Sequence, residues 1–212
     1  GSSITNSKYL NSDNSTKNYI YEDRENERNS KGYNGNFGIE LYLNESTSWT
    51  NSLNYRKSNG DNVDNVFLNY YDSGFNYNYT RNRINGEISD SENVEFATNF
   101  MKKFKRDGHK LTIDGSFSSN DDVNDALITE TATNSNPLKL DKTINNQNQK
   151  RNLIQVDYVL PFGKGSQFEA GYRGDFSDLV TDYQVENDGI INNNFTNTLD
   201  YKEKVNALYT QY

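Results

Sequence analysis

The residues best suited to chemistry are charged and amide side chains at alternate positions of two neighbouring segments. They are Gln155 and Asp157 within residues 153–160, and Glu169, Arg173 and Asp175 within residues 166–177. Side chains of a strand alternate between its two faces, so each set lies on one side of its segment. Residues 161–165 form a predicted hairpin turn, which brings both sets to one face of a sheet. That face could contact a passing solute, but pairing of its own charges, or holding another domain, is the favoured interpretation.

The sequence contains no set of residues typical of catalysis. His109 is the only histidine, and its position just after a turn favours a structural or interfacial role. There is no glycine-rich phosphate loop, no His-Glu-x-x-His motif, no nucleophile elbow and no cysteine. Asp121, Asp122 and Asp125 could offer oxygen ligands to Ca²⁺, but their spacing matches no complete calcium loop, and a solvated loop is favoured. We expect no enzymatic activity, no cofactor and no metal.

The composition is unlike that of an ordinary soluble domain. Only 32% of residues are hydrophobic and the mean hydropathy is −1.02, values that approach those of disordered chains. Yet aromatic residues make up 13%, with 16 Tyr and 11 Phe, so aromatics could cover one face of a sheet while the other stays wet. The net charge of −8 disfavours nucleic acid as a partner. No apolar run approaches the ~20 residues of a transmembrane helix.

Alternation with a period of two is the clearest secondary-structure signal, and helical periodicity is not convincing anywhere. The alternating runs predict an all-β, antiparallel up-and-down sheet. The predicted strands are 36–44, 48–57, 92–105, 108–120, 149–161, 166–177 and 198–212, and an eighth could lie within 4–21. The segment 66–83 is also strand-like, and it either extends the sheet or forms a hairpin within a loop.

The predicted connections are of two kinds that alternate along the chain. Short turns lie at 44–47, 105–108 and 161–165, and long polar loops lie at 57–92, 119–150 and 178–198. Outer-membrane barrels have short periplasmic turns and longer extracellular loops, and their strands need about 9–11 residues to cross the bilayer. The pattern therefore predicts a transmembrane β-barrel in the cell outer membrane, in contact with lipid and lipopolysaccharide. Gln155, Asp157, Glu169, Arg173 and Asp175 then become candidates for its polar, lumen-facing side.

Seven strands cannot close a barrel, because a sheet in lipid must have no open edge and bacterial barrels use even strand numbers. We therefore expect residues 1–34 to be a strand end and an external loop, and residues 35–212 to be part of a larger barrel domain. A compact eight-stranded barrel that uses the segment 4–21 is the alternative.

Five stretches of the sequence together resemble a known family. They are FKRDGHKL at 104–111, QVDYVLP at 155–161, QFEAGYRG at 167–174, LDYKE at 199–203 and NALY at 206–209. Their order and spacing resemble the barrel domain of Bacteroidetes TonB-dependent outer-membrane receptors, in the outer membrane β-barrel protein family. The resemblance covers about residues 35–212. It implies a 22-stranded barrel, an N-terminal plug domain as partner, often a carboxypeptidase-regulatory-like domain, and energy delivered through TonB.

Three functions are compatible with these observations. The leading hypothesis is a receptor barrel that imports a scarce nutrient, such as a chelated metal, a glycan or a peptide. The second is a non-transporting barrel subunit or scaffold, which docks a surface lipoprotein or another outer-membrane partner through its loops. The third is a soluble all-β adhesion or glycan-binding module, which would have to leave Ile154, Tyr158 and Phe168 in water.

Overall fold

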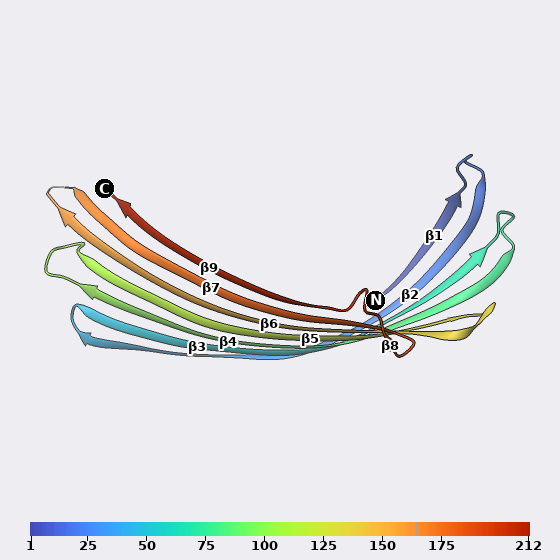
Figure 1. Cartoon of the computed structure of the whole chain (residues 1–212), viewed down its shortest axis with the longest axis horizontal. Coiled ribbons are helices and arrows are strands. Elements are labelled where there is room, and N and C mark those ends of the chain that lie inside the picture. Colours follow the sequence, from blue (N-terminus) through green and yellow to red (C-terminus); the bar gives the residue numbers. More distant parts are fainter. Residues whose placement is uncertain (164) are drawn as a thin grey trace.

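A computed structural model describes residues 1–163 and 165–212, and the side chains of 135–138 are left aside. Lys164, in the predicted turn 161–165, lies outside the described residues. The described chain is a single antiparallel sheet in which each long strand pairs with the long strands next to it in sequence (Figure 1). In chain order its strands are β1 (Ser2–Leu10), β2 (Thr16–Asn44), β3 (Thr47–Tyr71), β4 (Tyr77–Lys103), β5 (Lys110–Ala132), β6 (Ser135–Phe162), β7 (Ser166–Asn187), β8 (Ile190–Ile191) and β9 (Asn197–Gln211). The predicted all-β, up-and-down fold class is confirmed.

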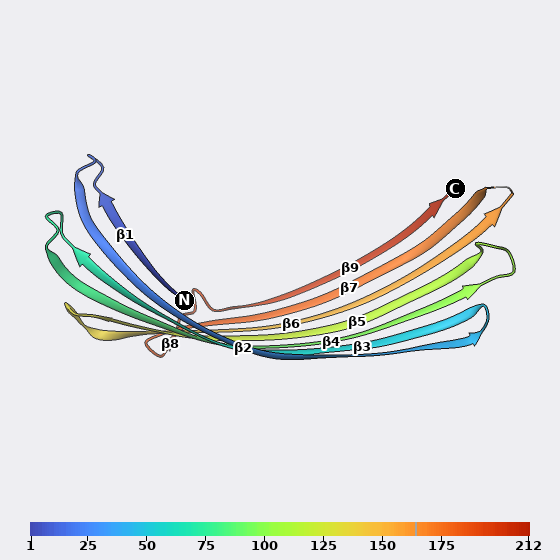
Figure 2. The same cartoon turned by 180° about the vertical axis from the view of Figure 1, so that it is seen from behind.

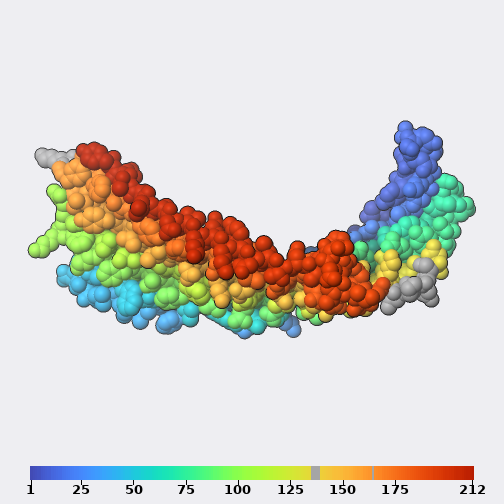
Figure 3. Space-filling view, in the orientation of Figure 1, coloured from blue at the N-terminus to red at the C-terminus, as the bar shows by residue number. Residues whose placement is uncertain are grey.

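The sheet is one layer thick and has almost no interior. In the part of the chain that the structure describes, Val66 is the single buried hydrophobic residue, and Thr47 is the single buried polar one. Large hydrophobic side chains such as Trp49, Phe96 and Ile154 are each 42% exposed. The strands form a long, curved ribbon, and no other part of the described chain covers either face (Figures 2 and 3). Such a sheet cannot be stabilised by a packed core of its own, so its apolar side chains need cover from outside the described chain.

The three predicted long loops are wrong. Segments 57–92, 119–150 and 178–198 consist mostly of strand: β3 continues to Tyr71 and β4 begins at Tyr77. β5 and β6 are likewise joined by residues 133–134 alone, and β7 ends at Asn187, followed by the two-residue strand β8. Connections are therefore short at both ends of the sheet, and the predicted asymmetry of loop lengths is absent. The strand-like segment 66–83 extends the sheet, as one of its two interpretations predicted.

These polar segments form strands because the sheet is much longer than a bilayer is thick. β3 has 25 residues, so at about 3.3 Å per residue it is roughly 80 Å long, far more than a bilayer requires. Outside the bilayer both faces of a strand contact water, so the apolar–polar alternation that marks a membrane strand disappears. Asn and Asp are then tolerated because the ladder with neighbouring strands satisfies the backbone, as in the unbroken pairing of Arg81 through Lys103 with Ala132 through Lys110.

The structure gives the number of strands and shows whether the sheet closes into a barrel. Eight long strands and the short β8 are present, and the segment 4–21 holds β1, a turn and the start of β2 rather than one strand. Residues 1–34, expected as a strand end and a loop, are β1, that turn and the first part of β2. Within the described residues, β1 pairs only with β2 and β9 only with β7, so the sheet is open. The compact eight-stranded barrel is not formed.

The register assigns every strand residue to one of two faces, because directly paired residues point to the same side. One face carries an apolar band near the β2–β3, β4–β5 and β6–β7 turns. A row of this band runs across six strands and consists of Leu41, Trp49, Phe100, Ile113, Val156 and Tyr172. The opposite face, here called the polar face, carries Ser, Asn, Gln and charged residues at the same level. The apolar band is the part of the sheet suited to contact lipid.

Polar side chains within the apolar band have partners. Trp49 Nε1 donates to Thr98 Oγ1 at 2.8 Å, and the Thr98 hydroxyl donates to Asn51 Oδ1 at 2.8 Å. At the turn end, the Lys102 ammonium donates to Ser46 Oγ at 2.9 Å and to Thr47 Oγ1 at 2.7 Å. Lys102 therefore reaches back toward the turn, as a lysine at the membrane interface does.

Two glycines of β7 are covered by aromatic rings. A Cβ atom on Gly171 would lie 2.2 Å from Tyr209 Cζ, because the Tyr209 ring of β9 crosses directly over this position on the polar face. On the apolar face, a Cβ atom on Gly174 would lie 2.6 Å from the Tyr172 hydroxyl, which donates to Asn206 Oδ1 at 2.6 Å. The glycines allow these rings to lie flat on the sheet.

Candidate functional site

The five polar candidates all lie on the polar face. Gln155 of β6 pairs directly with Arg173 of β7, and Asp157 pairs with Gly171. Gln155 Nε2 donates to Asp157 Oδ2 at 2.8 Å. Glu169 lies nearer the turn, where it accepts from Gln167 Nε2 at 2.5 Å rather than from the other candidates. The structure thus groups four of the five candidates and leaves Glu169 apart.

Asp175 forms ion pairs with two arginines on this face. Arg151 forms a bidentate pair with this carboxylate: its Nε donates to Oδ1 at 2.8 Å and its NH2 donates to Oδ2 at 2.5 Å. Arg173 NH2 approaches Oδ2 from the other side at 3.8 Å. Asp175 pairs with Leu153 in the register, so Arg151 reaches it across the diagonal between β6 and β7. The Asp175 side chain is 18% exposed, whereas that of Arg151 is 53% exposed.

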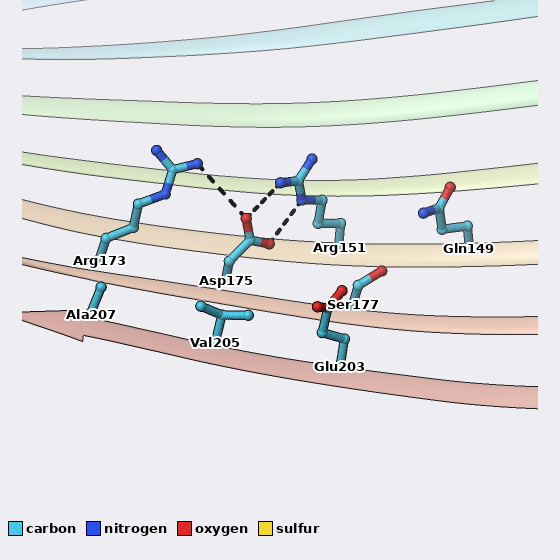
Figure 4. A pocket seen from close by; sticks show the side chains of 8 residues that line it. All are labelled: Gln149, Arg151, Arg173, Asp175, Ser177, Glu203, Val205 and Ala207. Atoms are coloured by element: carbon cyan, nitrogen blue, oxygen red, sulfur yellow. Dashed lines mark hydrogen bonds and ion pairs between the residues drawn. The ribbon is translucent and has the colours of Figure 1, made fainter.

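A shallow hollow surrounds this ion-pair cluster, which consists of Arg151, Arg173 and Asp175. It has a volume of about 450 Å³ and is also lined by Gln149, Ser177, Glu203, Val205 and Ala207 from β6, β7 and β9. Figure 4 shows Asp175 between the two arginines, with Ser177 further along the same strand and Glu203 on the neighbouring strand β9. Two guanidinium groups and two carboxylates give the hollow no formal net charge. It offers hydrogen-bond donors and acceptors to a polar solute or to a polar protein segment, and no nucleophile paired with a base.

Sequence reasoning missed Arg151, Glu203 and Gln149. Arg151 has the same parity as Gln155 and Asp157, so extending the alternation toward the amino terminus would have found it. Its partner could not be named without the register, because the contact runs diagonally rather than straight across. Glu203 lies on β9, whose pairing with β7 follows from a connection that the sequence did not resolve.

The other residues considered for chemistry have structural surroundings. The His109 ring stacks on Phe104 with centroids 4.1 Å apart, and its Nε2 lies 2.9 Å from the Tyr158 hydroxyl. In β5, Asp122 pairs with Gln147 on the polar face, while Asp121 and Asp125 point to the other face, so the three carboxylates do not converge. Among the described residues no group of His, Cys, Asp or Glu is placed to hold a metal ion. None of the described chain forms a helix long and apolar enough to cross a membrane.

A one-layer antiparallel sheet with a lipid-suited band on one face and a polar surface on the other defines the wall of an outer-membrane β-barrel. A family model described as the outer membrane protein beta-barrel family matches residues 102–212. The chain belongs to this family and is an outer-membrane protein. No curated protein matches it.

Proposed function

We propose that this chain forms part of the barrel of a TonB-dependent receptor that imports a scarce nutrient, such as a chelated metal, a glycan or a peptide. The observation that carries the proposal is the continuous polar face, which runs the length of the strands opposite the apolar band. A barrel wall with this arrangement encloses a hydrophilic lumen. The resemblance to TonB-dependent receptors adds TonB and a plug domain as the partners that would open and close the path.

Both edges of the described sheet support a larger barrel. The edge of β2 from Glu27 to Asn44 lacks a neighbour, since β1 ends its pairing at Glu25, and the outer edge of β9 is also free. In hydrocarbon each unpaired backbone N–H or C=O costs several kcal/mol. Further strands would pair with these edges, to a total of 22 if the resemblance extends to strand number.

The ion-pair cluster is proposed to contact what fills the lumen. Its hydrogen bonds hold Arg151 in place, while half of the side-chain surface of Arg151 and of Arg173 is still exposed. Exposed guanidinium groups on a lumen wall can bind carboxylates or hydroxyls of a plug or of a solute.

A double substitution R151Q/R173Q in the whole protein tests this function. We expect growth on the limiting nutrient to slow, uptake to fall several-fold, and the amount of protein in the outer membrane to be unchanged. R81Q is the matched control, because Arg81 lies on the same face but near the far tip, paired with Glu130 at 2.5 Å. Uptake that survives both deletion of the gene and loss of TonB would refute the import function.

A non-transporting scaffold is the second candidate function, and the length of the strands favours it. More than half of β3 extends beyond the length that the bilayer needs, which gives partners a large outer surface. A partner that remains bound in detergent at fixed stoichiometry, with no growth defect after gene deletion, would favour the scaffold over the receptor.

A further inference from the structure

Four aromatic side chains gather at the end of the sheet that lies away from the apolar band. They belong to β2, to β3, to the β3–β4 turn and to the start of β4, and are here called the aromatic tip: Tyr19, Tyr71, Phe75 and Tyr77. The Phe75 ring stacks on Tyr71 with centroids 4.9 Å apart at 11°, and meets Tyr19 edge-on at 5.1 Å. Tyr77 meets Tyr71 at 6.0 Å. The register places Tyr19 and Tyr71 on the same side as the apolar band, so the tip faces outward from the wall.

The backbone at Phe75 is held in a conformation that its side chain disfavours. Its φ is 65°, in the left-handed region that glycine, asparagine and aspartate tolerate and bulky residues avoid. The other positive-φ residues that are not glycine are, within the described chain, Asn14 and Asp188, both of tolerant types. The glycine of this turn, Gly74, would tolerate a positive φ, but it lies one residue before the position that has it. Phe75 is therefore an exception that costs conformational free energy.

Hydrogen bonds within the β3–β4 turn hold Phe75 in this conformation. Asp72 Oδ1 accepts from the Gly74 N–H at 2.9 Å and from the Asn76 N–H at 2.8 Å. The Phe75 N–H donates to the Asp72 carbonyl at 3.1 Å. Burial within the chain does not offset the cost, because Phe75 remains 64% exposed. An exposed aromatic ring fixed at the expense of backbone strain points to a ligand.

A hollow of about 490 Å³ lies beside these rings, within the size range of small-molecule sites. Tyr19, Tyr71 and Phe75 line it together with Asn6 and Lys8 of β1, and Lys8 pairs directly with Tyr19 in the register. In the part of the chain that the structure describes, neither the Asn6 amide nor the Lys8 ammonium has a hydrogen-bond partner or an ion pair. Their donors are free to reach a ligand that rests on the rings.

Flat rings beside free amide and ammonium donors suit a sugar. The C–H groups on one side of a pyranose ring carry partial positive charge, which the negative face of an aromatic ring attracts. The hydroxyls at the rim of the sugar can then accept from Asn6 and Lys8. The surroundings argue against a protein partner, because a stable protein interface buries about 800 Å² on each side. The two turns that flank the tip carry small polar residues, such as Ser12, Asn14 and Ser73.

We propose that the aromatic tip is a saccharide-binding site, in which a sugar ring stacks on Phe75, the more exposed ring of the Phe75–Tyr71 stack, and Asn6 and Lys8 bind its hydroxyls. The site lies on the outward side and does not depend on the proposed import through the lumen. Free oligosaccharides and the sugars of lipopolysaccharide share the required chemistry.

The substitution F75N separates binding from folding, because asparagine tolerates positive φ but has no aromatic ring. The whole protein, purified in detergent, is applied to an array of neutral and acidic oligosaccharides, and separately to lipopolysaccharide with and without its polysaccharide. We expect wild type to bind at least one sugar class, F75N to bind at least tenfold more weakly, and the thermal midpoint of F75N to equal or exceed that of wild type. F195N is the matched control, since Phe195 is also 64% exposed, lies in the β8–β9 connection and is not part of the hollow.

Binding to lipopolysaccharide only with its polysaccharide present would identify the cell's own surface as the source, and binding on the array would identify free glycans. The proposal is overturned if wild type binds no saccharide in either arm, if F75N binds as well as wild type, or if F195N is weakened equally. A protein that co-purifies through Phe75, in the absence of any sugar binding, would also overturn it.

Discussion

Gly171 lets the ring of Tyr209 lie flat across the joint between β7 and β9. Because β9 contacts only β7 among the long strands of the described sheet, this contact is one of the few side-chain interactions that hold it there. A methyl group at position 171 would overlap the ring and force Tyr209 into another rotamer.

We therefore expect G171A to destabilise the folded protein by about 1–3 kcal/mol, the usual cost of overpacking. Urea unfolding in lipid vesicles measures this change. G86A is the control, because only the Leu127 carbonyl oxygen lies within 4.0 Å of a Cβ atom there. In a Y209A background the penalty of G171A should disappear, and a penalty that persists would show that the ring is not its cause.

Asp72 makes the β3–β4 turn sensitive to acid. The backbone N–H of Asn76, and then the Asn76 amide and the Gly74 N–H, hold the pKa of the Asp72 carboxyl below its ordinary value of 3.8. A depressed pKa in the folded state means that the stabilisation is fully present above the ordinary pKa and is lost as the pH falls through the depressed value.

We predict that D72A speeds hydrogen exchange of the Gly74 and Asn76 amides at pH 7, and that the difference from wild type shrinks as the pH falls below the ordinary pKa of 3.8 and the Asp72 carboxylate becomes protonated. D72N keeps an acceptor oxygen without titrating, so its exchange should show no such pH dependence. The Ser46 amide, which donates to the neutral Asn44 Oδ1 at 3.0 Å, is the internal reference. A wild-type turn that stays equally protected after Asp72 has been protonated contradicts the prediction.

At the scale of the strands, the sequence predicts the membrane-facing half well and the outer half poorly. Each of the seven predicted strands overlaps an observed one and exceeds it by at most two residues at an end, because residues such as Ile113, Val156 and Tyr172 alternate with polar neighbours. The outer halves contain Asn and Asp at positions that usually indicate turns, and no face there is apolar. These outer halves remain extended only because they pair with equally long neighbouring strands. Such pairing is a property of the whole sheet and is not encoded in the local sequence.

Limited proteolysis from outside the cell distinguishes strands from loops. We expect proteinase K to cleave the whole protein at 11–15, 72–76 and 188–196, and to spare 57–71, where β3 is paired on both sides. V66P should open this segment to cleavage, since proline removes a ladder hydrogen bond at the buried Val66. Cleavage spread evenly over 57–92 in wild type would restore the loop interpretation.

At the scale of the whole molecule, the position of the apolar band determines how the sheet lies in the membrane. Ile113 is within the band, while Ile88 points to the same side of the sheet but lies in the outer extension and is 66% exposed. We predict that I113K lowers the stability of the vesicle-inserted protein by about 2–4 kcal/mol, the cost of a lysine near the bilayer midplane.

I88K should change that stability by less than about 0.5 kcal/mol, as for most surface substitutions. Urea titration of both variants in the same vesicles makes the comparison. Equal effects of the two lysines would place the bilayer elsewhere on the sheet.

The sequence predicts on which face of the sheet the candidate site lies, but not which residues contact one another there. The parity of Gln155, Arg173 and Asp175 was sufficient to place them together on one side. The pairing of Arg151 with Asp175 depends on a diagonal contact, and the aromatic tip depends on a turn whose positive φ falls on Phe75 rather than on Gly74. Both require the three-dimensional register, which alternation alone does not provide.

The continuation of β3, β4 and β5 beyond the bilayer also has a mechanical consequence. Each outer hairpin is joined to its neighbours by ladders that run without a gap for more than 20 residue pairs between β4 and β5. Drag from flowing fluid, or tension from a polymer attached at the far end, would be shared by many bonds loaded in shear. A flexible loop would uncoil under the same force, whereas this wall transmits it as a stiff lever to the part anchored in lipid.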